Sequence, residues 1–469
     1  MKDKLLDILT PAGQQHLVDF WDRLDDAWRR SLAEQIEAID FDLIDRLYGH
    51  RDDQGDFRQM ADRAGPPPAF RLDASANRFS PREARDRGAQ AIAAGQLGVI
   101  LVAGGQGTRL GFEHPKGMFP IGPVSGKSLF AIHVEKILAT GRRHGVRIPL
   151  YLMTSPATHD ETVRFFADHD RFGLAEEDFR VFCQGTMPVV DEATGKVLLD
   201  APGRIVVSPD GHGGTVAALD RSGSLDDVRQ RGIRQLFYFQ VDNPLVDICS
   251  PEFVGYHLLS RSELSSQVVT KRDPMERVGN VVEVDGRLRV IEYSDLAEDI
   301  ARRRNDDGSL SIWAGSIAVH VMDVAFLQRM TGTSDALPFH IARKKVSYVD
   351  PSGARIDPDG PNAIKFERFI FDLLPSAADA IVVEIDPADG FAPLKNAPGA
   401  DTDTPEWVRA RMVARHRRWL EQAGAVVAGG VAVEISPLFA LDAEELSGKV
   451  WLSDKIGPGT RVTEETHFC

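Results

Sequence analysis

The sequence predicts an α/β protein that is built on a mostly parallel sheet with helices on its faces. From residue 97 to about 400, short apolar runs alternate with amphipathic segments, which is typical of strands and helices that follow one another. Residues 99–103 form an unbroken apolar run, as expected for a strand buried on both faces. Further strands of the same sheet are predicted at residues 148–153, 179–182 and 236–241.

The same patterns divide the chain into three predicted parts. Residues 1–95 are expected to be a helical N-terminal region, residues 96–400 the α/β domain, and residues 401–469 a small β-rich C-terminal domain. Thr10 and Pro11 are predicted to begin an N-terminal helix, because Thr caps helices and Pro is favoured at their first position. Its apolar stripe would consist of Leu17, Phe20, Trp21, Leu24 and Trp28.

The last part is predicted to contain a basic helix from Val408 to Trp419, followed by β-like pieces at residues 431–435 and 449–452. The arginines of the helix resemble a nucleic-acid patch at first sight. However, Met412 and Trp419 lie among them and the surrounding chain is acidic, so a packed surface helix is favoured.

The composition is that of an ordinary globular protein and excludes several classes. The 55 Lys and Arg residues face 70 Asp and Glu residues, for a net charge of −15, which argues against nucleic acid as a partner. The three cysteines, Cys183, Cys249 and Cys469, are far apart and odd in number, so neither a disulfide framework nor a cysteine metal cluster is expected. No apolar run reaches the length of a membrane span and the first residues do not resemble a signal peptide, so we expect a cytoplasmic location.

The most informative stretch is residues 98–122, GVILVAGGQGTRLGFEHPKGMFPIG. The first predicted strand ends at Ala103, and the chain then turns through three glycines before Thr108. Glycine accepts positive φ and brings no Cβ near a ligand, so the backbone N–H groups of such a loop can point at phosphate oxygens. Arg109 and Lys116 add two positive charges, and the stretch is therefore predicted to bind a nucleotide phosphate. The glycines are Gly104, Gly105 and Gly107.

Two common phosphate loops do not fit this stretch. A Walker A loop continues from its last glycine into Lys and then Ser or Thr, whereas Thr108 and Arg109 follow Gly107. A dinucleotide-binding fingerprint needs a glycine at the position of Leu110, and no acidic residue follows about twenty residues later.

The motif GGQGTRLG followed by PKGM is similar to the signature of the UDP-sugar pyrophosphorylases, and especially of the eukaryotic-type UDP-N-acetylglucosamine pyrophosphorylases. The resemblance extends over about residues 95–440, with the motifs in the same order. It implies a Rossmann-like nucleotidyltransferase fold of the GT-A type, with a mixed sheet and helices on both faces. It also implies that UTP and a sugar 1-phosphate are the small-molecule partners.

The resemblance assigns roles to further residues. The catalytic residues would be Arg109, Lys116 and Lys395, which balance charge on the phosphates. The nucleotide would be bound by Ala103, Gly104, Gly105, Gly107, Thr108, Gln184, Gly211 and His212, of which Gln184 would contact the uracil base. The sugar phosphate would be bound by Gly279, Glu292, Ser316 and Lys365.

Two of these positions raise questions of their own. His212 stands where the family usually has asparagine, and we interpret it as a positioning or packing residue because the reaction has no hydroxyl to activate. Ser316 stands where the N-acetylglucosamine enzymes have the first asparagine of Ala-Gly-Asn-Ile-Ala-Asn-His. Serine offers fewer hydrogen bonds than an amide, so the preferred sugar stays open between N-acetylglucosamine, glucose and galactose.

Asp242 is the predicted metal ligand. It follows the predicted strand at residues 236–241, and the carboxyl ends of strands are where ligands collect in open α/β sheets. Nucleotidyl transfer places charge on phosphate oxygens, and a Mg²⁺ ion held by a carboxylate is the expected helper. The predicted function is therefore uridylyl transfer with Mg²⁺, and the alternative is a non-catalytic protein of the same fold that binds a UDP-sugar.

Overall fold

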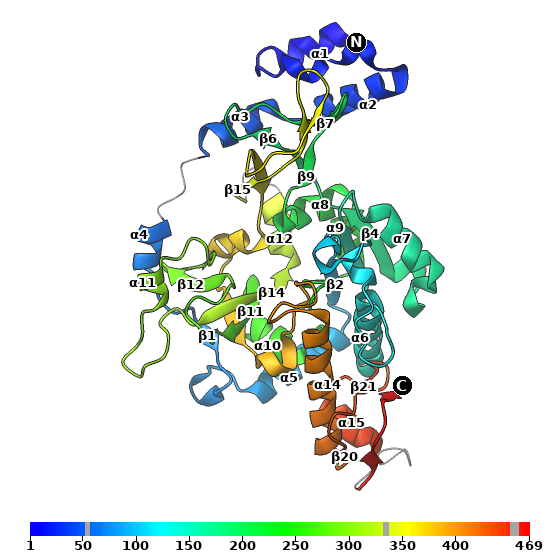
Figure 1. Cartoon of the computed structure of the whole chain (residues 1–469). Coiled ribbons are helices and arrows are strands. Elements are labelled where there is room, and N and C mark those ends of the chain that lie inside the picture. The colour runs from blue at the N-terminus through cyan, green and yellow to red at the C-terminus, as the bar shows by residue number, and fades with distance from the viewer. Residues whose placement is uncertain (52–56, 332–336, 451–458) are drawn as a thin grey trace. The chain divides into compact units, whose positions relative to one another are not determined.

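The computed structural model describes residues 1–51, 57–331, 337–450 and 459–469 (Figure 1). The chain forms two compact units. The larger contains residues 58–183, 216–334 and 373–469, and the smaller contains residues 1–57, 184–215 and 335–372. This grouping cuts across the boundaries that we expected near residues 95 and 400, so the three-part division stays a prediction.

A mixed sheet forms the centre of the larger unit. Five of the neighbouring pairs along its main order are parallel, and only the strand over Ala314–Asp323 runs antiparallel to both of its neighbours. The predicted mostly parallel sheet is therefore confirmed. Its main order is β1 (Ala69–Phe70), β19 (Ile381–Glu384), β11 (Leu264–Thr270), β14 (Ala314–Asp323), β10 (Gln235–Gln240), β2 (Leu97–Val102), β3 (Leu150–Thr154) and β4 (Phe179–Cys183), and β12 (Asn280–Val284) and β13 (Arg287–Ile291) extend it beside β14.

Helices pack on both faces of this sheet. On one face, Val99 of β2 and Phe237 of β10 share an apolar core with residues of α5 (Pro81–Ala93), α6 (Leu129–His144) and α10 (Pro251–Leu259). Because side chains alternate along a strand, Tyr151 of β3 points to the opposite face. There its hydroxyl donates to Asp227 of α9 (Ser224–Gln230) at 2.7 Å. The other helices between the terminal segments are α4 (Phe57–Asp62), α7 (His159–Asp168), α8 (Thr215–Arg221), α11 (Glu298–Ala301), α12 (Val324–Thr331) and α13 (Pro387–Gly390).

The smaller unit combines N-terminal helices with short antiparallel strands. Leu17 and Ile36 pack in one apolar core with Val190 and Phe366 from its strands. The helices are α1 (Lys2–Leu9), α2 (Asp26–Glu37) and α3 (Phe41–Gly49). The strands are β15 (His340–Lys344), β18 (Ala363–Glu367) and β6 (Val190–Asp191) in one sheet, and the pairs β5 (Thr186–Pro188) with β9 (Val207–Pro209), β7 (Leu199–Ala201) with β8 (Arg204–Ile205), and β16 (Tyr348–Val349) with β17 (Arg355–Ile356).

The prediction of a helix that begins at Thr10 and Pro11 is wrong. Helix α1 lies before these residues and ends at Leu9, and the predicted stripe is divided between two 3-10 turns and the start of α2. The reason is local: the Asp25 carboxylate accepts from the Trp28 N–H at 2.9 Å and caps α2. The stripe is nevertheless mostly buried, although Trp28 is exposed.

In the described part of residues 401–469, the C-terminal segment, two helices and two parallel strand pairs surround an apolar core of their own. The basic helix is confirmed as α14 (Pro405–Gln422), and the strand predicted at residues 431–435 as β21 (Val433–Ile435). The strand predicted at 449–452 is wrong for its first half, because Lys449 and Val450 end α15 (Ala443–Val450), and residues 451–452 lie outside the described residues. The remaining strands are β20 (Val426–Val427), which pairs with β22 (Arg461–Val462), and β23 (Thr466–Phe468), which pairs with β21.

Within the described ranges, no helix is both long enough and apolar enough to cross a membrane.

Candidate active site

The candidate site begins where two neighbouring strands end. Strands β2 and β10 are parallel, with Val102 opposite Gln240, and the Val241 N–H donates to the Val102 carbonyl at 3.0 Å. The segments that start at Ala103 and Val241 therefore leave the sheet side by side. Open α/β sheets bind their ligands at this edge. The structure thus brings the glycine loop and Asp242 together, as predicted.

Hydrogen bonds fold the glycine loop back on itself. The Gly107 N–H donates to the His114 carbonyl at 2.9 Å, and the Lys116 N–H donates to the Gly105 carbonyl at 3.0 Å. Directly after β3, the Ser155 hydroxyl donates to the Gly104 carbonyl at 2.7 Å. These bonds hold Lys116 against the loop, although it lies nine residues beyond Gly107.

The glycines of this loop act differently from our expectation. Positive φ occurs not at Gly104, Gly105 or Gly107 but at Gly111 just after the loop, with φ 69°. A Cβ on Gly107 would lie 2.7 Å from the Phe112 carbonyl oxygen, so this glycine permits the loop to pack on itself. A Cβ on Gly105 would meet no atom within 4 Å, and its N–H forms no hydrogen bond within the described part of the chain. Gly105 is therefore the position of the loop where the backbone stays open to a ligand.

Three residues with predicted roles, Lys116, Asp242 and Lys395, lie next to this loop. The Lys116 Nζ lies 3.9 Å from the Asp242 Oδ2 and donates to the Leu394 carbonyl at 3.1 Å. The Leu394 N–H in turn donates to the Asp242 carbonyl at 2.8 Å, and Lys395 follows directly. The side chains of Lys116 and Asp242 are only 19% and 12% exposed, so their attraction is screened less than that of a surface pair. Lys395 is exposed.

Arg109 and Thr108 lie on a short 3-10 turn (Thr108–Leu110) directly after the loop. Both are exposed, whereas Leu110 is buried and anchors the turn in the main core. The turn is thus fixed by its last residue and presents its first two to solvent. The catalytic role of Arg109 stays a prediction.

Asp242 is suited to holding a divalent cation together with a substrate. The described residues contain no group of three or more His, Cys, Asp or Glu that could form a complete metal site. Mg²⁺ does not need one, because it usually binds one or two carboxylates and completes its shell with water and substrate phosphates. A buried carboxylate at a strand end, beside an open glycine loop, fits that pattern.

Sequence reasoning missed Asp403, which lies beside these residues. Its carbonyl accepts from the Lys395 N–H at 2.8 Å, and its backbone has φ 62°. Burial raises the pKa of the Asp403 carboxyl; nearby Lys395 opposes this shift and nearby Asp242 adds to it. Asp403 is one of two aspartates in a polar loop and belongs to no spacing pattern, so only the fold reveals its position.

The predicted sugar-side residues of the larger unit also meet. The Ser316 N–H donates to the Gly279 carbonyl at 2.8 Å. A Cβ on Gly279 would lie 3.3 Å from the Glu292 Oε1 and 3.9 Å from the Ser316 Cβ. The absence of a side chain at Gly279 therefore leaves space between Glu292 and Ser316. All three residues are half-buried at the junction of β12, β13 and β14.

The other four predicted ligands belong to the smaller unit. Gln184 is buried, and the next residue, Gly185, accepts from the Asp210 N–H at 3.0 Å, which joins Gln184 to the loop that contains Gly211 and His212. Lys365 is half-buried in β18, opposite Ala342 of β15. The predicted meeting of these residues with those of the larger unit stays a prediction.

His212 makes the contacts of a packing residue. Its Nδ1 accepts from the Ile370 N–H at 3.2 Å, and its ring stacks on Phe369 with 5.2 Å between centroids. Burial, together with the nearby imidazole of His340, lowers the pKa of His212 to about 4. The ring is therefore neutral at pH 7, which agrees with our interpretation of His212 as a positioning or packing residue.

The sequence matches known proteins over most of its length. Residues 71–440 match the model of the UTP–glucose-1-phosphate uridylyltransferase family. A UDP-N-acetylglucosamine pyrophosphorylase of Saccharomyces cerevisiae is 39% identical over 374 residues, which covers 78% of each chain. A UDP-N-acetylhexosamine pyrophosphorylase-like protein 1 of Xenopus tropicalis is 37% identical, over 88% of this chain and 83% of that protein.

The fold has a similar match among solved structures. The uridine diphosphate N-acetylglucosamine pyrophosphorylase of Trypanosoma brucei superposes with a TM-score of 0.82 at 28% identity, and the match covers 98% of both chains. Together with the family match, this confirms the resemblance stated from the GGQGTRLG and PKGM motifs. The chain therefore belongs to the UTP–glucose-1-phosphate uridylyltransferase family.

Proposed function

We propose that this protein is a uridylyltransferase that converts UTP and N-acetylglucosamine 1-phosphate into UDP-N-acetylglucosamine and pyrophosphate. The observation that carries the proposal is the meeting of Lys116, Asp242 and Lys395 beside the open glycine loop. This arrangement offers cations and backbone N–H groups but no activated nucleophile. It suits a reaction in which the substrate supplies the nucleophile.

The proposed step is a direct transfer between the two substrates. An oxygen of the sugar phosphate forms a bond to the α-phosphorus of UTP. The bond from that phosphorus to the oxygen that bridges to the β-phosphate breaks, and pyrophosphate leaves with the electron pair. Positioning and charge stabilisation then account for catalysis.

In this scheme Arg109, Lys116 and Lys395 stabilise negative charge on the transferred phosphoryl group and on the departing pyrophosphate. The backbone of Gly104 to Thr108 binds the phosphates, and the Gly105 N–H is unused within the described residues. Gln184 contacts the uracil base, and Gly211 and His212 form the surface beside it. The buried position of Gln184 and the packing of the His212 ring support a rigid base site.

Asp242 would hold Mg²⁺ in this scheme. When bound, the ion supplies positive charge to the phosphate oxygens and orients them. Lys116, only 3.9 Å from the same carboxylate, would add a second positive charge beside the phosphates.

The sugar is proposed from the half-buried cluster of Gly279, Glu292 and Ser316, with Lys365 as a further ligand of the sugar phosphate. The S. cerevisiae and T. brucei relatives carry N-acetylglucosamine in their names, which places this sugar first. Glucose 1-phosphate and galactose 1-phosphate stay as alternatives, because Ser316 replaces the amide that the N-acetylglucosamine enzymes have at this position.

A pyrophosphate-release assay tests the proposed function. Purified protein is given UTP, Mg²⁺ and each of the three sugar 1-phosphates in turn, with CTP, ATP and GTP as controls for the base. We expect pyrophosphate and the corresponding UDP-sugar only with UTP. Binding of UDP-sugar without turnover of any sugar phosphate would contradict the proposal and support a non-catalytic binding protein.

The Ser316→Asn variant tests the specificity in the same assay. If Ser316 shapes the pocket, the ratio of kcat/KM between N-acetylglucosamine 1-phosphate and glucose 1-phosphate should change by about tenfold, the effect of one gained or lost buried hydrogen bond. The contrary result is a native enzyme that already prefers N-acetylglucosamine 1-phosphate a hundredfold and a variant with the same preference.

A further inference from the structure

The loop that carries Asp242 is buried almost throughout. It leaves β10 at Val241 and reaches α10 at residue 251, and within it residues 241–246 are all buried. Such a loop has no sheet or helix partner for its carbonyl oxygens, and buried carbonyls need hydrogen bonds from elsewhere. The source of these bonds therefore decides how firmly Asp242 is held.

Helix α6 contacts three of these carbonyls from one face. The His133 Nε2 lies 3.0 Å from the Val241 carbonyl oxygen. The Lys136 Nζ donates to the Pro244 carbonyl at 2.5 Å and to the Val246 carbonyl at 2.7 Å. Lys136 follows His133 by three residues, so both side chains lie on the same face of the helix. One helix face thus holds the loop on both sides of Asp242.

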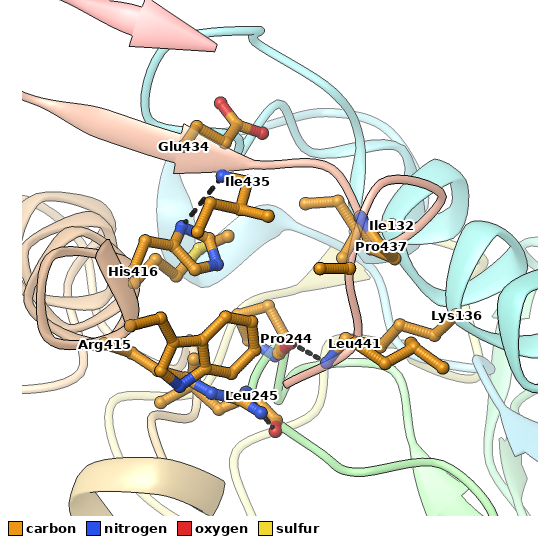
Figure 2. Close-up of a pocket in the computed structure, with 13 residues that line it drawn as sticks. Ile132, Lys136, Pro244, Leu245, Arg415, His416, Glu434, Ile435, Pro437 and Leu441 are labelled. Carbon is orange, nitrogen blue, oxygen red and sulfur yellow. Dashed lines mark hydrogen bonds between the residues drawn. The ribbon is translucent and has the colours of Figure 1, made fainter. Parts of the chain in front are cut away.

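Helix α14 supplies a further contact from the C-terminal segment, while the Asp242 carbonyl accepts from the Leu394 N–H at 2.8 Å. The Arg415 Nη1 donates to the Leu245 carbonyl at 2.9 Å, and its guanidinium lies over the ring of Trp419 at 4.7 Å. Figure 2 shows Lys136 and Arg415 with Pro244 and Leu245 around a cavity of about 30 Å³. Lys136 of α6 and Arg415 of α14 therefore both bind the backbone of this loop, although the two helices lie far apart in the sequence.

The burial of Lys136 and Arg415 does not by itself stabilise the folded protein. Lys136 and Arg415 are each only 8% exposed. Burial lowers the pKa of both groups, and the positive charge of Arg415 lowers the pKa of Lys136 further. Buried charges are costly, and well-packed apolar side chains in their place are often neutral or stabilising. What the two cations contribute is the set of hydrogen bonds to the loop.

We infer that Lys136 and Arg415 are positioning residues, which hold the Pro244–Val246 backbone so that the Asp242 carboxylate keeps its place beside Lys116. The inference rests on the proposed role of Asp242. It also gives the C-terminal segment a function, because α14 belongs to that segment while the loop belongs to the α/β core.

A second set of contacts agrees with this role of the C-terminal segment. The Glu434 carboxylate of β21 accepts from the Val124 N–H at 2.8 Å and from the Ser125 N–H at 2.7 Å. Arg409 of α14 donates to the Pro120 carbonyl at 2.7 Å. Residues 120–125 follow Lys116 closely, so the C-terminal segment contacts the chain next to both members of the Lys116–Asp242 pair.

The test compares Lys136→Met and Arg415→Met with a matched control on the same helix. Arg417 of α14 also donates to backbone carbonyls, those of Val427, Ala428 and Val431, which lie in the C-terminal segment and not in the Asp242 loop. Arg417→Met therefore removes a comparable set of bonds without touching the loop. Each variant is measured for Tm, for kcat and for the KM of both substrates.

We expect only Lys136→Met and Arg415→Met to lose at least about tenfold in kcat, the effect of a displaced supporting residue, whatever the change in their Tm. The KM for the sugar phosphate should stay within about twofold, since its proposed ligands lie elsewhere. Folded Lys136→Met and Arg415→Met proteins with the kcat of Arg417→Met would overturn the inference.

Two further measurements keep the test decisive. If a Met variant does not fold, Arg415→Lys is compared with Arg417→Lys, because lysine keeps one donor but loses the planar fork. A lower kcat in Arg415→Lys alone supports the inference, and equal kcat values overturn it. Asp242→Asn is assayed beside these variants. If Asp242→Asn is fully active, the proposed role of Asp242 is wrong. If Asp242→Asn is inactive but the Lys136 and Arg415 variants keep native kcat, only the positioning role of Lys136 and Arg415 is wrong.

Discussion

Two glycine-rich loops in this protein have similar composition and opposite surroundings. In the loop over residues 104–107, a Cβ on Gly105 would meet no atom within 4 Å. In the loop over residues 211–214, a Cβ on Gly211 would lie 2.3 Å from the Arg368 carbonyl oxygen, and one on Gly213 would lie 2.6 Å from the Arg368 carbonyl carbon. The first loop is open at Gly105, and the second is packed against the backbone of Arg368.

The difference shows that glycine can serve two purposes at a proposed nucleotide site. Around Gly105 the missing side chain leaves the backbone accessible to a ligand. Around Gly211 it permits backbone segments to touch, and the salt bridge between Arg368 and Asp210, at 2.7 Å, fixes them. We therefore expect changes in the first loop to affect the reaction, and changes in the second to affect the folded state.

The largest effect is expected for Arg109→Ala, next to the open loop. Loss of one preorganised charge that stabilises the transition state should lower kcat by about 10²–10³. The fold should stay intact, because Arg109 is exposed. Steady-state kinetics and a thermal melt check both points, with Arg30→Ala, an exposed arginine of α2, as the control. A variant with native turnover would contradict the proposed role.

Gly211→Ala should come next, as a loss of stability. Gly211 has φ 82° and ψ 165°, a backbone region almost restricted to glycine, and its Cβ would clash with backbone atoms. We expect the free energy of unfolding to fall by about 3 kcal/mol, measured by denaturant unfolding.

The matched variant in the open loop is Gly105→Ala. Its stability should change by less than about 0.5 kcal/mol, while the KM for UTP rises, because the new methyl group stands where a phosphate would approach. Equal destabilisation by the two alanine variants would remove the contrast between the loops.

Asp242→Asn tests whether the chemistry beside the open loop depends on a metal. The asparagine keeps the backbone bond to Leu394 but removes the charge. We expect a loss of about 10–100-fold in kcat/KM and a higher Mg²⁺ requirement. Titration of activity against Mg²⁺ measures both, and full native activity in excess chelator would refute the metal role.

The positions of β2, β3, β4 and β10 and the main phosphate loop could be predicted from the sequence because their signals are local. The apolar run at residues 99–103 and the glycines after it lie next to each other in the chain. The same holds for the run at residues 236–241 and Asp242. The pairing of β2 with β10, which brings the two strand ends together, comes from the structure.

The parts that could not be predicted depend on contacts between distant segments. Nothing near Arg415 in the sequence indicates that it reaches Leu245, and Lys136 resembles an ordinary surface lysine of an amphipathic helix. The N-terminal apolar stripe was mispredicted for a different reason, because a local contact and not a distant one determined its structure. Its spacing is helical, yet the cap formed by Asp25 starts the helix later, so a local hydrogen bond decided against the periodicity.

The smallest effect is expected at His212, inside the packed loop. Burial places its pKa at about 4 in the folded protein, below the ordinary value of 6.5. Between about pH 6.5 and pH 4 the unfolded chain therefore binds a proton that the folded protein excludes, and stability falls as the pH is lowered through this window. His212→Asn removes this proton uptake and still offers an oxygen to the Ile370 N–H.

The decrease in Tm from pH 7 to pH 5 should accordingly be about 2–4 °C smaller in His212→Asn than in the native protein. The deeply buried His133, His257 and His416, with pKa values of about 3, contribute equally in both proteins and cancel in the difference. His50→Asn, at an exposed position of the same unit, is the control and should leave the native slope unchanged. If His212→Asn and His50→Asn give the same pH dependence, His212 is not held neutral by its packing. The second glycine loop would then be less closed than its contacts indicate.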